Sequence, residues 1–376
     1  MHLLLNGFSL VRPLTGIGQY THHLANELDK HGLVENILYW GAVSVGDRQF
    51  LDNQLKIISK PASRSIRKLQ LLSTFRLNAF INHLTLKSGN LKNHIYHETN
   101  YVARPYHGKL VTTVHDLSFI HYPELHPPER IAHMKRLTET LERSAHVITD
   151  SDYVRNEVIE HYKIEPDRIS TVPLGVDSNF NPANDEEKEE FKLRYGIKSN
   201  FILMVGSIEP RKQIDKVIDA YLSLPENIKK EYVLVHAGPS GWNNSALSGQ
   251  FDKLTATGEL IALGYIDEAD LATLYSAATC LVYPSIYEGF GLPILEAMAS
   301  GTPVITSNLS SMPEVGGQAA MLIDPSSQEQ LRNALIEVLQ DLDLRERLTT
   351  AGIQHARLYR WQTCAQATAE IYKRVY

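Results

Sequence analysis

The sequence predicts an α/β protein of two domains, each built around a parallel sheet. The chain of 376 residues is longer than one typical domain core, for which about 150 residues is the usual length. Short apolar runs alternate with helical patterns, and runs such as 201–205 are apolar throughout, as in the interior of parallel sheets. Proline and glycine interrupt the chain at 173–177 and a polar, acidic stretch follows, which places a domain boundary near Asn179.

The first domain is expected to alternate strands with helices. Each expected strand is a short apolar run, and each expected helix follows a turn or a capping residue. The strands are expected at 2–6, 36–40, 93–97, 109–114, 145–149 and 169–172. The helices are expected near 15–30, 127–144 and 151–162, the last capped by Asp150 or Ser151.

The second domain repeats the alternation. Its strands are expected at 201–205, 232–236, 260–263, 279–283, 304–306 and 320–323. Its helices are expected near 213–224, 267–278 with Asp267 as the cap, 292–300 and 326–342, followed by a largely helical tail over 351–376.

Composition indicates a soluble globular protein. Hydrophobic residues make up 43% of the chain, and no run of 18 apolar residues is present. Residues 1–7 are too short and lack the basic region of a secretory signal, so they are expected to form the first strand. The two cysteines, Cys280 and Cys364, have neither metal-site spacing nor a disulfide framework, which favours a cytoplasmic location.

Basic residues are concentrated in one region, although the formal net charge is −6. Residues 51–110 hold ten basic and two acidic side chains, which indicates a surface facing an anionic partner. Within it, the stretch that starts at Arg64 and ends at Arg76 is compatible with a basic amphipathic helix on a membrane surface. A helix that packs its apolar side on its own domain explains the pattern equally well. No nucleic-acid partner is expected.

The most informative stretch is 279–306, where a strand, a glycine-rich loop, a helix and another strand follow one another. Glu288 lies in the loop and Glu296 in the helix, and Gly289 and Gly291 clear side chains from the loop. This layout presents unpaired amides and the positive end of a helix dipole to an anion. An ordinary strand-to-helix turn with two solvated glutamates is the alternative.

The motif resembles a known enzyme family. It is similar to the signature of retaining, nucleotide-sugar-dependent glycosyltransferases of family four. That similarity lies in Glu288 and Glu296, which are separated by seven residues, in Gly-Phe-Gly-Leu-Pro between them, and in Glu-Ala-Met-Ala-Ser-Gly-Thr-Pro-Val from Glu296 on. The resemblance implies the GT-B fold, with two Rossmann-like domains facing a cleft. It implies an acceptor-binding domain over 1–178, a nucleotide-sugar-binding domain over 179–355 and a C-terminal helix over 356–376 that crosses back to the first domain.

The turn after the strand 201–205 contains two cations. Arg211 can bond a diphosphate in a fork and Lys212 can act as a compact charge, although such a pair is often simply solvated. The family more commonly has an arginine directly after the glycine, where this chain has Ser207, so Arg211 is expected to act from another direction. The resemblance implies that the diphosphate also meets the amides of Phe290, Gly291 and Leu292, that Glu288 binds the donor sugar, that Glu296 holds the ribose, and that the base lies against Tyr265 and Ile266.

Gly16 and Gly18 form a Gly-x-Gly pattern, which alone is weak evidence for a nucleotide site. A nicotinamide site is excluded because the loop between strand and glycines is long and the next strand ends in Gly41 without an acidic residue. In the resembled family this loop lies near the acceptor and the donor phosphate, which implies that role for Gly16 and Gly18.

His115 follows the strand 109–114, at the edge where open α/β sheets bind ligands. It can bond a sugar hydroxyl, with Asp116 orienting its ring, or it can be a turn histidine bonded to backbone. The family places a histidine here close to the donor sugar, which favours a catalytic His115. Glu98 and Tyr101, in the polar loop before that strand, are expected to shape the acceptor pocket.

No metal site or cofactor is expected. The Asp-x-Asp pattern of Asp150 and Asp152 resembles the metal motif of the other major glycosyltransferase fold, but helix capping explains both residues and no third ligand is evident.

Three further motifs most resemble bacterial mannosyltransferases of O-antigen and capsule assembly: Gly-Ile-Gly-Gln-Tyr-Thr at 16–21, His-Asp-Leu-Ser-Phe at 115–119 and Glu-Pro-Arg-Lys at 209–212. This resemblance implies GDP-mannose as donor and a lipid diphosphate-linked acceptor. The catalytic set is expected to be Glu288, His115, Arg211 and Lys212. Front-face displacement is favoured over double displacement because no second carboxylate is placed as a nucleophile. The implied location is cytoplasmic, with peripheral contact at the inner membrane face. A UDP-sugar donor and a non-catalytic nucleotide-sugar-binding module are the alternatives.

Overall fold

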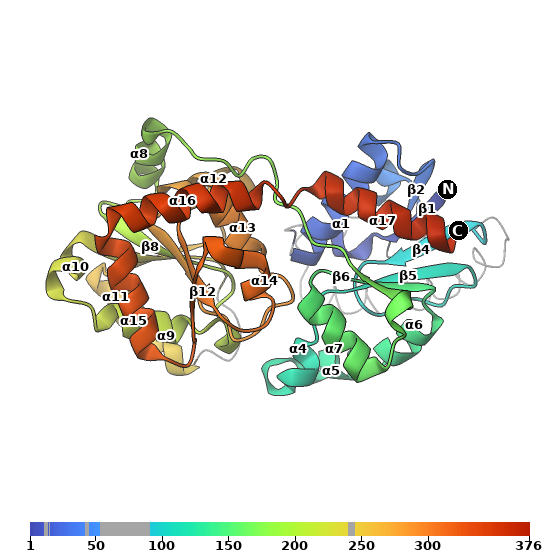
Figure 1. The fold of residues 1–376 in the computed structure, drawn as a ribbon, viewed down its shortest axis with the longest axis horizontal. Helices are drawn as coiled ribbons and strands as arrows, with labels where there is room; N and C mark the ends of the chain where they lie inside the picture. Colours follow the sequence, from blue (N-terminus) through green and yellow to red (C-terminus); the bar gives the residue numbers. More distant parts are fainter. Residues whose placement is uncertain (11–13, 15, 42–44, 53–90, 240–244) are drawn as a thin grey trace, which may run out of the picture. The chain divides into compact units, whose positions relative to one another are not determined.

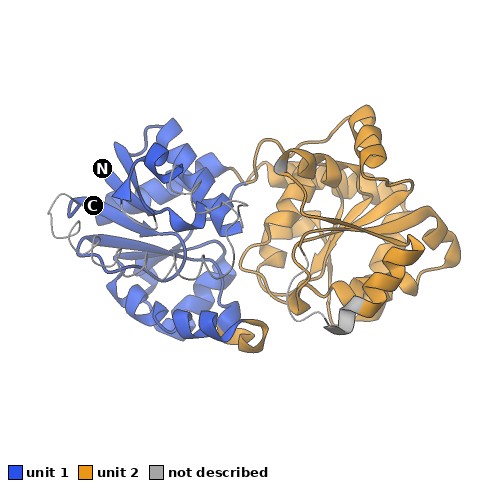
Figure 2. Ribbon diagram, turned by 180° about the vertical axis from the view of Figure 1, so that it is seen from behind, with its two compact units in different colours: residues 1–119, 127–175, 361–376 blue, residues 120–126, 176–360 orange. Residues whose placement is uncertain are grey.

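The computed structural model describes residues 1–376 except 11–13, 15, 42–44, 53–90 and 240–244. The basic stretch between Arg64 and Arg76 therefore lies outside the described residues. The chain divides into two compact units, coloured separately in Figure 2. The first comprises residues 1–119, 127–175 and 361–376, and the second comprises residues 120–126 and 176–360.

The first unit is built on a sheet with the strand order β3-β2-β1-β4-β5-β6-β7. Neighbouring strands are parallel except for the pair β2 and β3. The strands are β1 (His2–Asn6), β2 (Asn36–Trp40), β3 (Val45–Gly46), β4 (His94–Glu98), β5 (Lys109–Val114), β6 (His146–Thr149) and β7 (Ile169–Thr171). The helices are α1 (Gly16–Lys30), α4 (Ser118–His121), α5 (Pro128–Met134), α6 (Leu137–Arg143), α7 (Asp152–Tyr162) and α17 (Trp361–Val375). The strands expected from the sequence are confirmed, and β3 is additional.

The helix expected over 127–144 is wrong as a single element. The structure divides it into α5 and α6, because the amide of Arg136 binds the carbonyl of His133, three residues back, at 3.2 Å. This tighter turn interrupts the regular hydrogen-bond ladder of the α-helix. Helix α7 is capped by Ser151, whose side chain accepts a hydrogen bond from the amide of Val154.

The last helix, α17, belongs to the first unit and lies beside α1 (Figure 1). Its buried positions include Ala365 and Ala369, whose small side chains allow close packing. The ring of Trp361 stacks on His23 of α1, with centroids 4.7 Å apart. A C-terminal helix that returns to the first unit agrees with the expected fold.

The second unit is built on a parallel sheet with the order β10-β9-β8-β11-β12-β13. Its strands are β8 (Asn200–Val205), β9 (Tyr232–Ala237), β10 (Leu260–Gly264), β11 (Cys280–Tyr283), β12 (Val304–Ser307) and β13 (Met321–Ile323). Its helices are α8 (Asp185–Arg194), α9 (Ile214–Leu222), α10 (Glu226–Glu231), α11 (Ser245–Thr257), α12 (Glu268–Ala277), α13 (Leu292–Ala299), α14 (Met312–Gly316), α15 (Gln328–Gln340) and α16 (Leu342–Ala356).

A continuous hydrophobic core covers one face of this sheet. Ile202 and Met204, alternate residues of β8, pack in one cluster with Val217 of α9 and Leu335 of α15. Alternation along the strand places these side chains on a single face. Residues 201–204 of the apolar run are buried on both faces, as the sequence predicts for an interior parallel strand, and Val205 is half-buried.

In the second unit, one helix, one helix end and one cap differ from the sequence prediction. The acidic linker forms α8, because Asn184 and Glu187 complete a capping box at its start. The helix expected over 326–342 ends at Gln340, and Asp341 caps the separate helix α16 by accepting from the amide of Leu344 at 2.9 Å. Asp267 stands at the cap position of α12 but makes no capping hydrogen bond.

Candidate active site

Two loops of opposite charge meet at the carboxyl edge of the second unit's sheet. The strands β8 and β11 are parallel neighbours, so their carboxyl ends lie at the same edge. The loop after β8 carries Arg211 and Lys212, and the loop after β11 carries Glu288. The amide of Ile286 donates to the carbonyl of Arg211 at 2.9 Å, which joins the two loops directly.

Glu288 contacts both cations. Nη1 of Arg211 lies 2.7 Å from Oε2, and Nζ of Lys212 lies 2.5 Å from Oε1. The hydroxyl of Tyr283 donates to Oε1 at 2.8 Å, and the ammonium of Lys212 also bonds that hydroxyl. All three charged side chains are largely buried. The structure therefore brings together three of the four expected catalytic residues.

The electrostatics of the cluster keep Glu288 ionised. Burial alone raises the pKa of this carboxyl, but Arg211 and Lys212 outweigh it and lower the pKa to about 2. The pKa of Lys212 is also lowered, because burial and the neighbouring Arg211 together outweigh the attraction of Glu288. A carboxylate beside two cations can bind sugar hydroxyls, and the cations can bind a diphosphate.

Glu209 was missed by the sequence analysis. Its Oε2 accepts from Nε of Arg211 at 2.9 Å, and its Oε1 accepts from the hydroxyl of Ser207. Glu209 therefore binds both Ser207 and Arg211. A signal was present in the sequence, since a glutamate two residues before an arginine in a tight turn is within reach of it.

Two serines anchor the backbone of Glu288. The hydroxyls of Ser310 and Ser311 donate to its carbonyl at 2.5 and 2.9 Å. Ser310 adopts a φ of 55°, an uncommon conformation for a residue with a side chain. These bonds fix the direction of Glu288, and the sequence carried no signal for them.

The helix α13 begins where the sequence predicts, at Leu292. Gly291 precedes it with a φ of +107°, which a residue with a side chain rarely adopts. No side chain caps the first turn, where Pro293 has no N–H and the amide of Ile294 donates to the carbonyl of Gly291 at 3.0 Å. The amide of Leu292 is the one in this turn that can meet an anion, as the motif implies. Phe290 is buried, and Glu296 accepts from the hydroxyl of Tyr275 at 2.8 Å.

The loop after β10 exposes one aromatic ring. Tyr265 is 60% exposed, whereas the side chain of Ile266 is buried. Tyr265 is thus placed to stack on a ligand, while Ile266 offers only its backbone. Their expected contact with a nucleotide base stays a prediction.

In the first unit, His115 is held by groups from both neighbouring strands. His115 and Asp150 directly follow Val114 and Thr149, which are paired in the register of β5 and β6. The Nδ1 atom of His115 lies 2.6 Å from Oδ2 of Asp150, and its Nε2 atom lies 2.9 Å from the carbonyl oxygen of Thr99. A carbonyl oxygen can only accept, so the ring donates from Nε2 to Thr99, while Nδ1 faces the carboxyl group of Asp150.

This geometry corrects the expected partner of His115. The carboxylate that orients the ring is Asp150, whereas Asp116 accepts from the amide and the hydroxyl of Ser118 at 3.1 and 2.9 Å. Burial lowers the pKa of His115, but Asp150 and the Thr99 carbonyl raise it above its ordinary value. Since both ring nitrogens are engaged, the catalytic role of His115 stays a prediction.

The expected acceptor contacts of Glu98 and Tyr101 are not supported by their burial. Glu98 is completely buried, and its oxygens accept from Asn6, Tyr96 and the amide of Asn100 at 2.5 to 2.9 Å. Tyr101 is also buried, with its hydroxyl accepting from the amide of Asp116. A carboxylate satisfied inside the fold orders the loop and does not reach a ligand.

The two glycines at the start of α1 have different surroundings. A Cβ atom at Gly18 would lie 2.6 Å from the carbonyl oxygen of Ser9, so this position needs glycine for packing. A Cβ atom at Gly16 would meet no atom of the described residues within 4 Å. Gly16 is therefore the one of the two whose side-chain space is open to a ligand.

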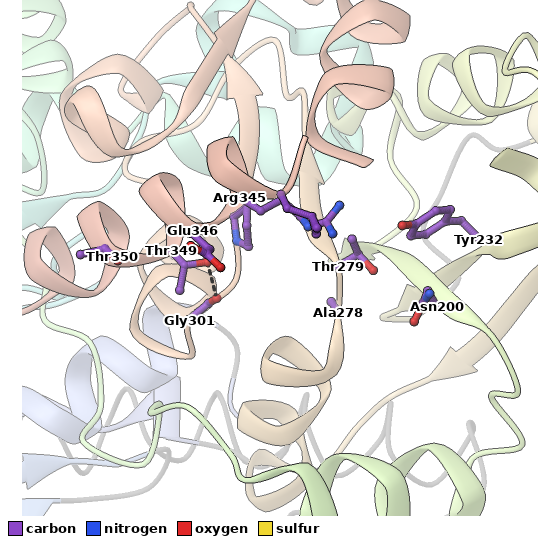
Figure 3. Close-up of a pocket in the computed structure, with 11 residues that line it drawn as sticks. Asn200, Tyr232, Ala278, Thr279, Gly301, Arg345, Glu346, Thr349 and Thr350 are labelled. Atoms are coloured by element: carbon purple, nitrogen blue, oxygen red, sulfur yellow. Dashed lines mark hydrogen bonds between the residues drawn. The ribbon is translucent and has the colours of Figure 1, made fainter. Parts of the chain in front are cut away.

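A cavity of about 500 Å³ lies at the opposite edge of the second unit's sheet (Figure 3). It is lined where strands begin, at residues such as Asn200 and Tyr232, and is therefore remote from Glu288. Nη1 of Arg345 donates to two backbone carbonyls at the end of α15, and Thr349 donates to the carbonyl of Gly301 at 3.1 Å. These contacts support the fold and identify no ligand.

In the described part of the chain, no group of three or more His, Cys, Asp or Glu side chains is arranged to hold a metal ion. No described helix has the length and apolar character needed to cross a membrane.

Comparison with known proteins decides the family. Residues 14–180 match the family described as Glycosyltransferase Family 4, and residues 185–355 match the one described as Glycosyl transferases group 1. The chain is 35% identical over 373 residues to the O-antigen chain mannosyltransferase B of Escherichia coli, with 96% of each chain covered. The chain belongs to glycosyltransferase family 4. The expected family and enzyme class are thereby confirmed.

Other relatives of this glycosyltransferase agree. It is 30% identical over 275 residues to the serotype-specific mannosyltransferase WbdA of Escherichia coli and spans 34% of that longer protein. Its fold resembles WaaG, a glycosyltransferase involved in lipopolysaccharide biosynthesis, with a TM-score of 0.72, 20% identity and 99% of both chains covered. It also resembles a sucrose-phosphate synthase from Thermosynechococcus elongatus, with a TM-score of 0.76, 19% identity, and 100% and 98% coverage. The expected GT-B fold of two Rossmann-like domains is confirmed.

Proposed function

We propose that this glycosyltransferase transfers mannose from GDP-mannose, with retention at the anomeric carbon, to a hydroxyl of a lipid diphosphate-linked glycan in bacterial surface polysaccharide synthesis. The observation that carries the proposal is the Glu288, Arg211 and Lys212 cluster, in a chain 35% identical over most of its length to an O-antigen chain mannosyltransferase. A second relative named as a mannosyltransferase supports the same sugar.

In this proposal the second unit binds the donor. Arg211, Lys212 and the amides near Gly291 neutralise the diphosphate. Losing one such hydrogen-bond donor typically costs about 3 kcal/mol of transition-state stabilisation. Glu288 binds the sugar hydroxyls and Glu296 holds the ribose. The base lies against the ring of Tyr265 and the backbone of Ile266.

The proposed reaction is a front-face displacement. The bond between the anomeric carbon and the phosphate oxygen breaks, and its electron pair stays on the diphosphate. The acceptor oxygen bonds the anomeric carbon from the same face, and its proton passes to the departing phosphate oxygen. His115 lines the reacting face. Trapping a glycosyl-enzyme adduct by mass spectrometry would contradict the scheme.

The proposal assigns acceptor binding to residues 1–178 and nucleotide-sugar binding to residues 179–355, with residues 356–376 returning to the first domain. A lipid-linked acceptor requires the enzyme to work at a membrane surface. The basic residues between Arg64 and Arg76 are suited to attract an anionic inner face.

A thermal-shift screen tests the donor assignment. Purified protein is heated with GDP-mannose and with UDP, ADP and dTDP sugars, each with and without magnesium. One-site binding at 100 times the dissociation constant stabilises by about 2.7 kcal/mol, which gives a visible shift. A metal-independent shift with GDP-mannose is expected. A shift with another nucleotide sugar alone would overturn the donor assignment.

Transfer itself is tested with radiolabelled GDP-mannose and a lipid extract from cells that make a surface polysaccharide. Label in the organic phase is expected with the native protein and absent with the Lys212→Ala variant. The Glu190→Gln variant serves as the control, since Glu190 is 71% exposed and remote from the cluster.

A further inference from the structure

Glu209 lies in the loop after β8, and other residues of the same loop bind it. Only 9% of its side chain is exposed. Oε2 accepts from Nε of Arg211 at 2.9 Å, and Oε1 accepts from the hydroxyl of Ser207. Its carbonyl oxygen also accepts from the amide of Lys212 at 2.9 Å. Glu209 is therefore a fixed part of the loop that carries both cations.

The guanidinium of Arg211 lies between two carboxylates of different origin. Glu209 holds Nε from two residues away in the same loop, whereas Glu288 holds Nη1 from the loop after β11. A contact inside one tight loop persists when the loop shifts as a body. A contact between two loops is the one that an incoming ligand can replace.

The charges of the cluster balance before any ligand is bound. Two cations, Arg211 and Lys212, face two carboxylates, Glu209 and Glu288. Burying both cations with one carboxylate would leave an uncompensated charge, which is costly. A diphosphate brings its own negative charge, so it can take the place of one carboxylate.

We propose that Glu209 is a positioning residue of the donor site. It holds Arg211 by Nε and balances one positive charge, so that the diphosphate replaces Glu288, and not Glu209, at the guanidinium. The exchange releases the oxygens of Glu288 for the sugar hydroxyls. The remaining charge of Glu209 weakens the hold on the nucleoside diphosphate product and favours its release. This inference rests on the proposed function, because it requires a diphosphate at Arg211.

Isothermal titration of GDP and of UDP into the full chain tests the inference. Glu209→Gln keeps an acceptor for Nε but removes the charge, so the dissociation constant is expected to fall about tenfold. Glu209→Ala removes both the charge and the acceptor for Nε, so the gain in GDP affinity is expected to be smaller than with Glu209→Gln, or to become a loss. Glu226→Gln removes the same charge at a site that is 78% exposed on α10, and it is expected to match the native protein.

A double-mutant cycle separates positioning from a structural role. In an Arg211→Ala background, Glu209→Gln is expected to change GDP affinity less than twofold, because the residue acts through Arg211. An equal gain with and without Arg211 would overturn the inference. So would a Glu209→Gln variant that binds like Glu226→Gln, or one whose affinity falls together with its melting temperature.

Two failures are distinguishable. If the native protein binds neither GDP nor UDP, the proposed function is overturned and this inference falls with it. If the native protein binds one of them but Glu209→Gln fails the comparisons above, only the inference is overturned.

Discussion

The Nη1 atom of Arg211 lies 2.7 Å from Oε2 of Glu288, and this contact joins the loops that follow two neighbouring strands. The strands β8 and β11 are parallel and adjacent, so a basic loop and an acidic loop meet at one edge of the sheet. Lys212 approaches the other oxygen, so two cations together keep the carboxylate of Glu288 ionised. A ligand that binds these cations therefore changes the contacts of Glu288.

Replacing Glu288 by Gln is expected to lower sugar transfer at least 100-fold, or roughly 3 kcal/mol, because the variant loses charged contacts to the donor. The melting temperature is also expected to fall, since Arg211 and Lys212 lose a buried counter-charge. Transfer assays and thermal melts measure both effects, with Glu190→Gln as the exposed control. A Glu288→Gln variant with half the native activity would contradict the assigned role.

The stability contributed by Glu288 should depend on pH in a defined window. Its folded pKa is lowered from 4.5 to about 2, so its contribution is present above the unfolded pKa and is lost as the pH falls toward the folded one. The difference in unfolding free energy between the native protein and Glu288→Gln is expected to shrink by about 2 kcal/mol between about pH 5 and about pH 3. Urea unfolding of both proteins measures it, and a difference that is flat across this range would refute the ion pair.

Replacing Asp150 by Asn is expected to lower the pKa of His115. Burial alone lowers this pKa, and Asp150 is the main group that raises it. A raised folded pKa contributes stability below the unfolded value and loses it as the pH rises through the folded one. The native protein should therefore be more stable than Asp150→Asn, and the difference in unfolding free energy should be larger at about pH 6 than at about pH 9.

NMR titration of the imidazole, assigned with His115→Asn, reports the pKa of His115 directly. An unchanged titration in Asp150→Asn would show that the 2.6 Å contact does not set the proton affinity of the ring.

Replacing Tyr372 by Phe is expected to destabilise the protein by about 1–2 kcal/mol. The hydroxyl of Tyr372 lies 2.6 Å from Nδ1 of His97, and both residues are completely buried. The substitution leaves that nitrogen without a partner and weakens the attachment of α17. Urea unfolding measures the loss, and Tyr376→Phe is the control because Tyr376 is 62% exposed. Equal effects of the two substitutions would count against the bond.

The two glycines at the start of α1 should respond differently to alanine. Gly18→Ala is expected to lower stability by about 1–3 kcal/mol, because its Cβ would lie 2.6 Å from a carbonyl oxygen of Ser9. The added Cβ of Gly16→Ala meets none of the described atoms, so this variant is expected to keep its melting temperature. Under the proposed function, Gly16→Ala should still lower transfer. Native levels of transfer by this variant would show that Gly16 does not contribute to the donor site.

Local patterns in the sequence located most strands and the start of the signature helix. The bounds of β1, β2 and β5 agree with the apolar runs, and α13 begins at Leu292 as expected. These features depend on neighbouring residues, namely apolar periodicity and the punctuation by glycine and proline. The capping box of Asn184 and Glu187 is also a local pattern, and it would have predicted the start of α8.

The sequence by itself determined the two-domain α/β class, the family motif and the presence of Glu288, Arg211 and Lys212. Only the tertiary structure decided which side chains meet. His115 pairs with Asp150 because β5 and β6 are adjacent in register, and Glu98 is bound inside the fold by Asn6 of the neighbouring strand β1. Strand order and register arise from packing over the whole chain, so a local pattern can name a residue without naming its partner.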